Sequence, residues 1–202
     1  MANLKAIRIR ISSVKSTRQI TSAMKMVSAA KLRRAQDKIV RLKPYVNKLQ
    51  EILGGLSKSL ADAEVENIYG RVSDPENILI VVVTSNRGLC GAFNANVIKE
   101  TRKLISEKYP EQYRKGNVKI LTIGKKGYDF FRKTSVKLLP DQNSLLNHLT
   151  FESVSVVAEE LMRSFVSKEY DRIDIVYNQF KNAAVQNLTV ESFLPVTGGP
   201  KG

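Results

Sequence analysis

The sequence predicts an α/β protein in which a long N-terminal coiled-coil helix precedes a Rossmann-like domain with a mostly parallel sheet. Two observations support this fold class. Apolar residues of the first quarter recur at alternating spacings of three and four, which is typical of a coiled-coil helix. Later in the chain, short apolar runs alternate with helical patterns, which favours parallel strands joined by crossover helices. We expect a coiled-coil helix over residues 1–60, a linker over 61–75, the α/β domain over 76–196 and a flexible end over 197–202.

The N-terminal heptad pattern indicates one helix from about Leu4 to Gly54. Pro44 interrupts the pattern and predicts a kink just upstream, because proline removes one backbone hydrogen bond. A helix of this length needs a partner of similar length, and no later segment has a comparable pattern. The partner could be a second copy, another protein, or a segment that this sequence lacks. The apolar seam consists of Leu4, Ile7, Ile11, Val14, Leu32, Ala35, Ile39, Leu42, Val46, Leu49, Leu53 and Leu56.

Most of the net charge of +14 belongs to this helix, since residues 1–56 hold 13 Lys and Arg against Asp37 and Glu51. The basic helix could bind nucleic acid, lie on a membrane surface, pack inside an acidic protein sleeve, or simply be solvated. No zinc-ligand spacing, basic region ahead of a zipper or RNA-binding aromatic motif supports nucleic acid. Tyr45 is the one aromatic residue in the segment, and the basic residues lie on several faces, which argues against membrane insertion. These observations favour an acidic protein sleeve or a solvated face over nucleic-acid or membrane binding.

The rest of the sequence reads as a compact α/β unit after a turn-forming linker that ends at Ser73-Asp74-Pro75. Each expected element follows from an apolar run, a helical period or a cap. A largely parallel sheet with one antiparallel edge is expected. In chain order we expect a strand at Asn77–Thr84, a loop at Ser85–Gly91, a helix at Asn94–Ser106, a strand at Val118–Ile123, a short helix at Lys125–Arg132, a short strand at Val136–Leu139, a helix capped by Thr150 and reaching Lys168, and strands at Ile173–Phe180 and Val185–Phe193.

The loops of this unit do not match nucleotide-binding motifs. Gly124-Lys125 is followed by Lys126, whereas a phosphate-binding loop needs Ser or Thr at that position. Gly88 and Gly91 form a lone Gly-x-x-Gly, and the dinucleotide fingerprint needs a third glycine. We therefore expect no nucleotide cofactor.

Catalytic and metal-binding patterns are also missing from the sequence. One cysteine, Cys90, and one histidine, His148, cannot form an internal disulfide or a zinc site by themselves. Cys90 is more readily interpreted as a small buried residue near a turn than as a nucleophile. Glu159 and Glu160 are adjacent on an expected helix and point in different directions, so they do not form a shared carboxylate site. We expect no enzymatic activity, cofactor or metal in this chain, and no apolar run is long enough to span a bilayer.

Two sequence blocks resemble the gamma subunit, or central stalk, of F-type ATP synthases. The first is TRQITSAMKMVSAAKLRRAQ at residues 17–36, and the second is TSNRGLCGAFN at residues 84–94. The resemblance runs from Ala2 to about Pro195. It implies a rotor subunit whose helix forms a shaft inside a hexamer of alternating alpha and beta subunits. The Rossmann-like domain would be a foot near the c-subunit ring and the epsilon subunit, and the subunit would couple proton flow to ATP synthesis or hydrolysis without being catalytic itself.

The resemblance also implies particular contact residues. Residues near the acidic loops of the beta subunits would be Met24, Lys25, Lys31, Arg33 and Arg34; for Met24, packing in the coiled coil is an equally good interpretation. The foot loop contains Arg87, Gly88 and Gly91. It would either stabilise the fold at the edge of the sheet or contact the epsilon subunit and the ring, and we favour the role in the fold. The resemblance implies no nucleic-acid partner.

The sequence departs from the family at its end, because family members continue into a second long helix. Two alternatives therefore stay open: a truncated gamma-like protein that binds a partner helix in an assembly without transmitting torque, and a basic nucleic-acid-binding protein. The single cysteine argues against the chloroplast form with its dithiol switch, and similarity from Ala2 leaves no room for a presequence. We expect a bacterial protein on the cytoplasmic side of the inner membrane, peripheral and attached only through other subunits.

Overall fold

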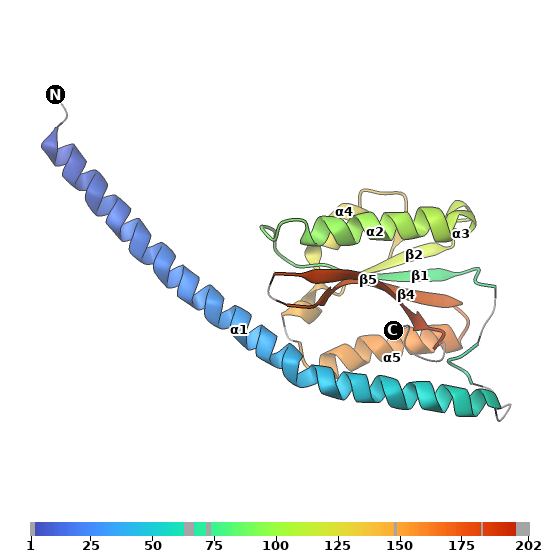
Figure 1. Ribbon diagram of the computed structural model, residues 1–202. Helices are drawn as coiled ribbons and strands as arrows, with labels where there is room; N and C mark the ends of the chain where they lie inside the picture. The colour runs from blue at the N-terminus through green and yellow to red at the C-terminus, as the bar shows by residue number, and fades with distance from the viewer. Residues whose placement is uncertain (1–2, 63–66, 72–73, 148, 183, 197–202) are drawn as a thin grey trace. The chain divides into compact units, whose positions relative to one another are not determined.

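The computed structural model describes residues 3–62, 67–71, 74–147, 149–182 and 184–196 (Figure 1). The chain divides into two compact units, residues 1–52 and 53–202. The expected flexible end over 197–202, part of the expected linker and His148 lie outside the described residues.

The first unit is most of the helix α1, Leu4–Asp62, which has 59 residues and is therefore about 90 Å long. Asn3 begins it by accepting a hydrogen bond from the Lys5 N–H on its side-chain oxygen at 3.0 Å. Pro44 lies inside the helix, as expected, and the helix bends in its second half, where Pro44 lies (Figure 1). The expected end at Gly54 is wrong. Two glycines cost only about 1 kcal/mol each in a helix, and the residues from Leu56 to Asp62 contain neither glycine nor proline to stop it.

The second unit is built on a five-stranded sheet in the order β3-β2-β1-β4-β5. All neighbouring strands are parallel except β4 and β5, which are antiparallel, so the expected topology is confirmed. The short strand expected at Val136–Leu139 has only two residues. The strands are β1 at Ile78–Val83, β2 at Val118–Ile123, β3 at Lys137–Leu138, β4 at Arg172–Phe180 and β5 at Gln186–Leu194.

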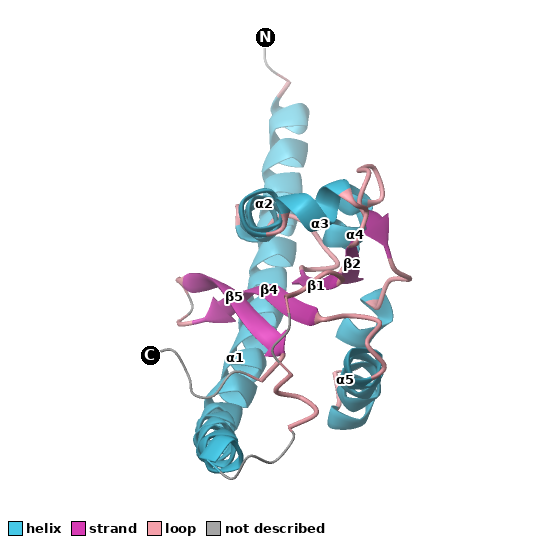
Figure 2. Ribbon diagram, turned by 90° about the vertical axis from the view of Figure 1, so that its right-hand side faces the viewer, coloured by secondary structure: helices cyan, strands magenta, loops and turns pink. Residues whose placement is uncertain are grey.

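Helices cover both faces of the sheet, with α2, α3 and α4 on one side and α5 on the other (Figures 1 and 2). The expected cap at Thr150 is confirmed, because its hydroxyl accepts a hydrogen bond from the Ser153 N–H at 3.2 Å. Two short elements were not expected, α3 and the 3-10 helix η1. Proline at the first position starts α3 without losing a backbone hydrogen bond. The helices are α2 at Phe93–Lys108, α3 at Pro110–Arg114, α4 at Lys125–Phe131, η1 at Asn143–Leu146 and α5 at Phe151–Val166.

The central strand β1 is buried on both faces, which explains its continuous apolar sequence. Ile78, Ile80 and Val82 pack in a cluster that includes Val97 of α2. Leu79 and Val81 pack in a second cluster, which includes Leu161 and Phe165 of α5. One strand therefore holds the two layers of helices on the sheet.

A buried carboxylate on β4 ties the end of α2 to the sheet. The Asp174 side chain is fully buried and accepts hydrogen bonds from the Tyr109 hydroxyl, from Lys108 Nζ at 3.2 Å and from Arg172 Nε at 3.0 Å. Three donors compensate the cost of burying this charge. Burial, and next the hydrogen bond to Asp174, raise the pKa of Tyr109 well above its ordinary value.

The raised pKa predicts that the domain loses stability at alkaline pH. An unfolded tyrosine releases its proton near pH 10, whereas folded Tyr109 keeps it, so stability is complete below about pH 10 and falls above it. Each such tyrosine contributes a slope of about 1.4 kcal/mol per pH unit. Tyr177, whose pKa is raised to about 12 by burial and Glu191, acts in the same direction. Urea unfolding from pH 7 to 11.5 should show the Tyr109→Phe variant losing stability less steeply than the parent; equal slopes would contradict this interpretation.

Candidate partner interface

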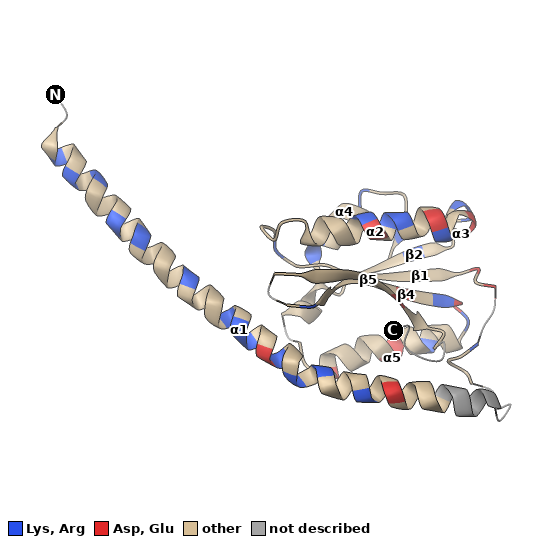
Figure 3. Ribbon diagram, in the orientation of Figure 1, with Lys and Arg blue, Asp and Glu red and all other residues tan. Residues whose placement is uncertain are grey.

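The five residues predicted to contact a partner all lie exposed on α1, between residues 24 and 34. Met24 has 64% of its surface exposed, which is high for an apolar side chain. The sequence block at 17–36 contains no acid, and the basic residues form a run along the helix (Figure 3). This stretch of α1 is a positively charged surface with an exposed methionine in it.

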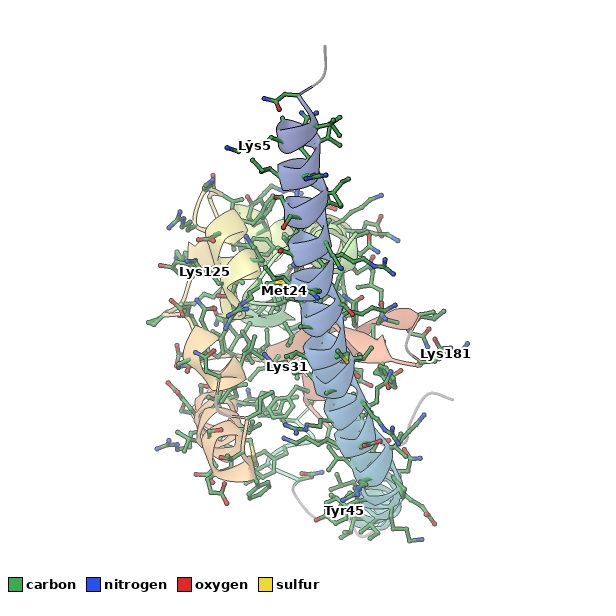
Figure 4. The ribbon with its side chains drawn as sticks, turned by 90° about the vertical axis from the view of Figure 1, so that its left-hand side faces the viewer. Lys5, Met24, Lys31, Tyr45, Lys125 and Lys181 are labelled. Atoms are coloured by element: carbon green, nitrogen blue, oxygen red, sulfur yellow. The ribbon has the colours of Figure 1, made fainter. Side chains whose placement is uncertain are left out.

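The structure brings some of these residues together and separates others. Met24 and Lys31 are two turns apart on the same side of α1 (Figure 4), and Arg34 is one turn beyond Lys31. At 3.6 residues per turn, Arg33 points to the opposite side from Met24, and Lys25 and Arg34 lie between the two sides on opposite flanks. The positive charge therefore surrounds the helix. Such a distribution fits a partner that encloses the helix better than one that offers a single flat surface.

The apolar seam of α1 is also exposed. Exposed fractions of its large apolar residues run from 37% at Ile39 and Val46 to 71% at Leu4. A long apolar stripe of this kind marks an interface, because monomeric proteins rarely expose large contiguous apolar patches. The helix thus offers a heptad seam for a helical partner as well as a basic surface.

The inner side of the foot loop is filled by the domain's own asparagines. Asn86 Oδ1 accepts from the Lys125 N–H at 2.9 Å, and Asn94 Oδ1 accepts from the Ser85 N–H at 2.9 Å. Asn143 Oδ1 accepts from the Gly124 N–H at 3.0 Å. Parallel α/β sheets bind ligands at this carboxyl edge of the strands. Here the backbone N–H groups of Ser85, Gly124 and Lys125 already donate to asparagine side chains, so they are not free to bind a phosphate.

The outer side of the foot loop projects into solvent. Arg87, Gly88 and Gly91 are exposed, and Gly91 has a positive φ of 58°. Leu89 is fully exposed and has a φ of 62°, which is unusual for a branched apolar residue. Sequence reasoning missed Leu89, although an apolar residue inside a polar loop was a usable signal. The backbone strain and the exposure together mark Leu89 as a candidate contact residue.

The expectation that Cys90 is buried is wrong. The Cys90 side chain is exposed, and its sulfur accepts a hydrogen bond from Asn94 Nδ2 at 3.2 Å. The left-handed residues on either side of it, Leu89 and Gly91, turn the loop outward, which a composition argument could not foresee.

Leu89→Gly should make the domain more stable by about 0.5–1 kcal/mol, because glycine adopts a positive φ without strain. The thermal midpoint and the urea midpoint of the two forms measure this. Leu89→Ala, which keeps the strain and removes the apolar side chain, is the control. A stability gain for Leu89→Ala equal to that for Leu89→Gly would show that the strain argument is wrong.

The described residues contain no group of three or more His, Cys, Asp or Glu side chains that could hold a metal ion. Within those same residues, no helix has the length and hydropathy needed to cross a membrane.

The sequence profile of a protein family described as ATP synthase matches residues 3–201. An ATP synthase gamma chain of Flavobacterium johnsoniae is 51% identical over 196 residues, which cover 97% of this chain and 66% of the relative. The gamma chain of Chlorobaculum tepidum is 45% identical over 202 residues, which cover 100% of this chain and 68% of the relative. The chain spans about two thirds of the length of the curated relatives it matches.

Solved structures with the same fold come from mitochondrial ATP synthases. The central stalk and c-ring structure from Tetrahymena thermophila contains a chain that aligns with a TM-score of 0.59 at 24% identity, covering 87% of this chain and 72% of that one. A rotor structure from Euglena gracilis aligns with a TM-score of 0.57 at 24% identity, covering 92% of this chain and 60% of that one. These likenesses establish a shared fold.

Proposed function

The chain belongs to the ATP synthase family represented by the gamma chains, and we propose that it acts as the central-stalk rotor subunit of an F-type ATP synthase. In this role it couples proton flow through the membrane sector to ATP synthesis or hydrolysis in the alpha/beta hexamer. It does so mechanically, as a subunit without a catalytic site of its own.

The observation that carries the proposal is the charge distribution around α1. A shaft that turns inside a ring of subunits meets each of them in succession, so its contact surface must continue around its circumference. Lys31 on the side of Met24, Arg33 on the opposite side, and Lys25 and Arg34 on the two flanks meet this requirement. The long-range attraction of a basic shaft to acidic loops does not depend on one rotational angle.

The partners we propose are the alpha and beta subunits around α1, and the epsilon subunit and c-subunit ring at the foot. The exposed outer side of the foot loop, with Arg87, Gly88, Leu89 and Gly91, is the candidate contact with the epsilon subunit or the ring. Membrane association then depends on other subunits. We place the protein peripherally on the cytoplasmic side of a bacterial inner membrane, in keeping with its bacterial relatives. Nucleic acid is not required by any of these contacts.

Capture of the chain by purified alpha and beta subunits tests this function. The chain is compared with a version completed by the last third of the Flavobacterium johnsoniae gamma chain, and both are measured by native mass spectrometry and ATPase rate. We expect one copy in each active hexamer. If neither version joins the hexamer, the rotor proposal is wrong; if only the completed version joins, the chain needs a second helix to act as the rotor.

The substitution Met24→Lys adds one charge to the contact zone on α1. The contact zone is the set of residues proposed to meet the beta subunits: Met24, Lys25, Lys31, Arg33 and Arg34. Met24 is 64% exposed, so the substitution should change the free energy of unfolding by less than about 0.5 kcal/mol. In reconstituted enzyme it should lower ATP synthesis per proton transported while ATP hydrolysis persists. Met24→Leu, which keeps an apolar side chain of similar size, is the matched control. Unchanged coupling in Met24→Lys would remove Met24 from the contact zone.

A further inference from the structure

The segment that leads from α1 to the sheet is attached to the α/β domain. Of this segment the structure describes residues 67–71 and 74–77, and we call residues 67–71 the strap. Tyr69 in the strap packs against the core cluster that contains Phe165 of α5. Its carbonyl oxygen accepts a hydrogen bond from the Val196 N–H at 2.7 Å. The strap is therefore attached both to the core on the α5 side of the sheet and to the chain that leaves β5.

Arg71 provides a second attachment, at the carboxyl end of α5 on the face of the sheet opposite α2 (Figure 2). Its Nη2 atom lies 3.4 Å from the Phe165 carbonyl oxygen, 3.5 Å from the Tyr170 carbonyl oxygen and 3.5 Å from Asp171 Oδ1. A cation is favourable near the last carbonyls of a helix, which lack partners within the helix. The Arg71 Cζ atom also lies 4.9 Å from the centroid of the Phe165 ring. The distances are at the long end for hydrogen bonds, so the attachment depends on several contacts together.

Asp171 connects Arg71 to the segment before β1. While its Oδ1 atom faces Arg71, its Oδ2 atom accepts hydrogen bonds from the Glu76 N–H at 3.1 Å and the Asn77 N–H at 2.9 Å. The Asp171 N–H donates in turn to the Asn77 carbonyl oxygen at 2.9 Å. Both side chains of the ion pair are partly shielded from water, at 26% exposed for Arg71 and 18% for Asp171. One side chain of the strap thus reaches α5, the turn before β4 and the segment before β1.

An arginine is a poor choice at this position if stability alone decides. Arg71 Nε is buried and has no hydrogen-bond partner among the described residues, and a buried polar group without a partner lowers stability. Well-packed apolar side chains often stabilise a domain as much as a buried ion pair does. Apolar packing is not directional, however, whereas the planar guanidinium group binds acceptors in fixed directions. What Arg71 adds to the strap is therefore a defined orientation.

We propose that Arg71 is a positioning residue, which fixes the strap and through it holds the carboxyl end of α1 on the α/β domain. Residues 53–62 of α1 belong to the same compact unit as the sheet, and the strap lies between them and β1 in the sequence. The inference rests on the proposed function for one consequence, that torque between the shaft and the foot crosses the strap. The attachment itself rests on contacts within the domain.

Three measurements test this role of Arg71 in the variant Arg71→Met, in which an unbranched apolar side chain replaces the guanidinium group. The first is amide hydrogen exchange of Val196, whose N–H is bound to the strap. The second is the distribution of distances between spin labels on Cys90 and on Leu56→Cys, two exposed positions, in the free chain. The third is the angular variance of a probe on Cys90 after assembly with the alpha/beta hexamer, with ATP withheld.

Lys119→Met is the matched control for Arg71→Met. Lys119 Nζ also lies over an aromatic ring, 5.1 Å from the centroid of Tyr170, and it forms an ion pair with Glu169 at 3.3 Å. Its side chain is 33% exposed, which is close to the value for Arg71. Among the described residues it has no hydrogen bond or ion pair to the strap. The control therefore removes similar contacts from the same turn and leaves the strap attached.

We expect Val196 to exchange at least about tenfold faster in Arg71→Met, because the loss of contacts to a charged group lets the strap open locally. In Lys119→Met the rate should stay within about twofold of the parent. The variances of the label distance and of the probe angle should roughly double in Arg71→Met alone, since one of the two attachments of the strap is lost. Should Arg71→Met not fold, Arg71→Lys keeps the charge without the planar fork and should change all three values in the same direction.

Equal Val196 exchange in the two methionine variants would overturn the inference and leave the proposed function intact. Equal variances of the label distance in the parent and in folded Arg71→Met would overturn it as well, because a residue that only stabilises the domain does not change the width of that distribution. If no complex with the hexamer forms, the proposed function fails, and the two measurements on the free chain decide whether Arg71 fixes the strap.

Discussion

Reversing the charge of Lys25, Lys31, Arg33 and Arg34 to glutamate should weaken capture of the chain by the alpha/beta hexamer at least about 30-fold. Each exposed ion pair contributes about 0.2–1 kcal/mol, and reversal adds a repulsion of similar size. For four residues the total is roughly 2–8 kcal/mol, and 2 kcal/mol, the lower end, corresponds to about 30-fold in affinity. Capture by immobilised hexamer, read by interferometry at several salt concentrations, measures this. The effect should shrink as salt screens the charges.

Two controls separate local contact from total charge. Glutamine at the same four positions removes the attraction without adding repulsion, so its loss of affinity should be intermediate. Glutamate at four exposed basic residues of the α/β domain gives the same net charge and should leave capture nearly unchanged; these are Lys99, Arg102, Lys115 and Lys133. If this domain variant binds as weakly as the helix variant, the specific contact zone on α1 is refuted.

Gly124→Ala should destabilise the α/β domain by about 3–5 kcal/mol, the largest effect of a single substitution that we expect. Gly124 has a φ of 116°, a region that side chains rarely adopt. A Cβ atom there would lie 2.1 Å from the Thr84 carbonyl oxygen and 2.7 Å from its hydroxyl oxygen. The Thr84 hydroxyl also accepts a hydrogen bond from the Gly127 N–H at 2.8 Å, so moving Thr84 would break the start of α4.

Gly116→Ala is the matched control for Gly124→Ala. Gly116 also has a positive φ, of 74°, but its nearest neighbour would be the flexible Lys137 side chain at 3.6 Å. It should therefore cost only the backbone strain, about 1 kcal/mol. Urea unfolding followed by far-ultraviolet circular dichroism compares the two variants. A cost for Gly124→Ala no larger than that for Gly116→Ala would contradict the close approach of the two loops.

The regular elements could be predicted because local patterns determine them. The heptad spacing of α1 and the buried run of β1 are periodic, and the Thr150 cap is a local motif. The helix end was misplaced because two glycines weaken a helix without stopping it. Residues 56–62 contain no further glycine or proline, and the helix continues to Asp62. Burial of Cys90 was wrong for a related reason, since the direction of a loop depends on individual φ angles.

The contacts that hold the domain together could not be predicted, because they join residues far apart in the sequence. Asp174 meets Tyr109, 65 residues earlier, and Asn143 meets the Gly124 backbone, 19 residues earlier. No periodicity links such residues. The distribution of positive charge around α1, in contrast, follows from the spacing of the basic residues and the geometry of a helix. That part of the candidate site could therefore be predicted from the sequence.

Rotation of the chain inside a surface-fixed alpha/beta hexamer is the most direct test of the rotor function. Cys90 is the single cysteine and is exposed in the foot loop, so a bead or a fluorophore can be attached there without other changes. During ATP hydrolysis we predict rotation in one direction with three pauses per turn, for this chain or for the version completed by a relative's last third. A probe that stays at a fixed angle in both versions, while the hexamer hydrolyses ATP with one copy bound, would contradict the proposed function.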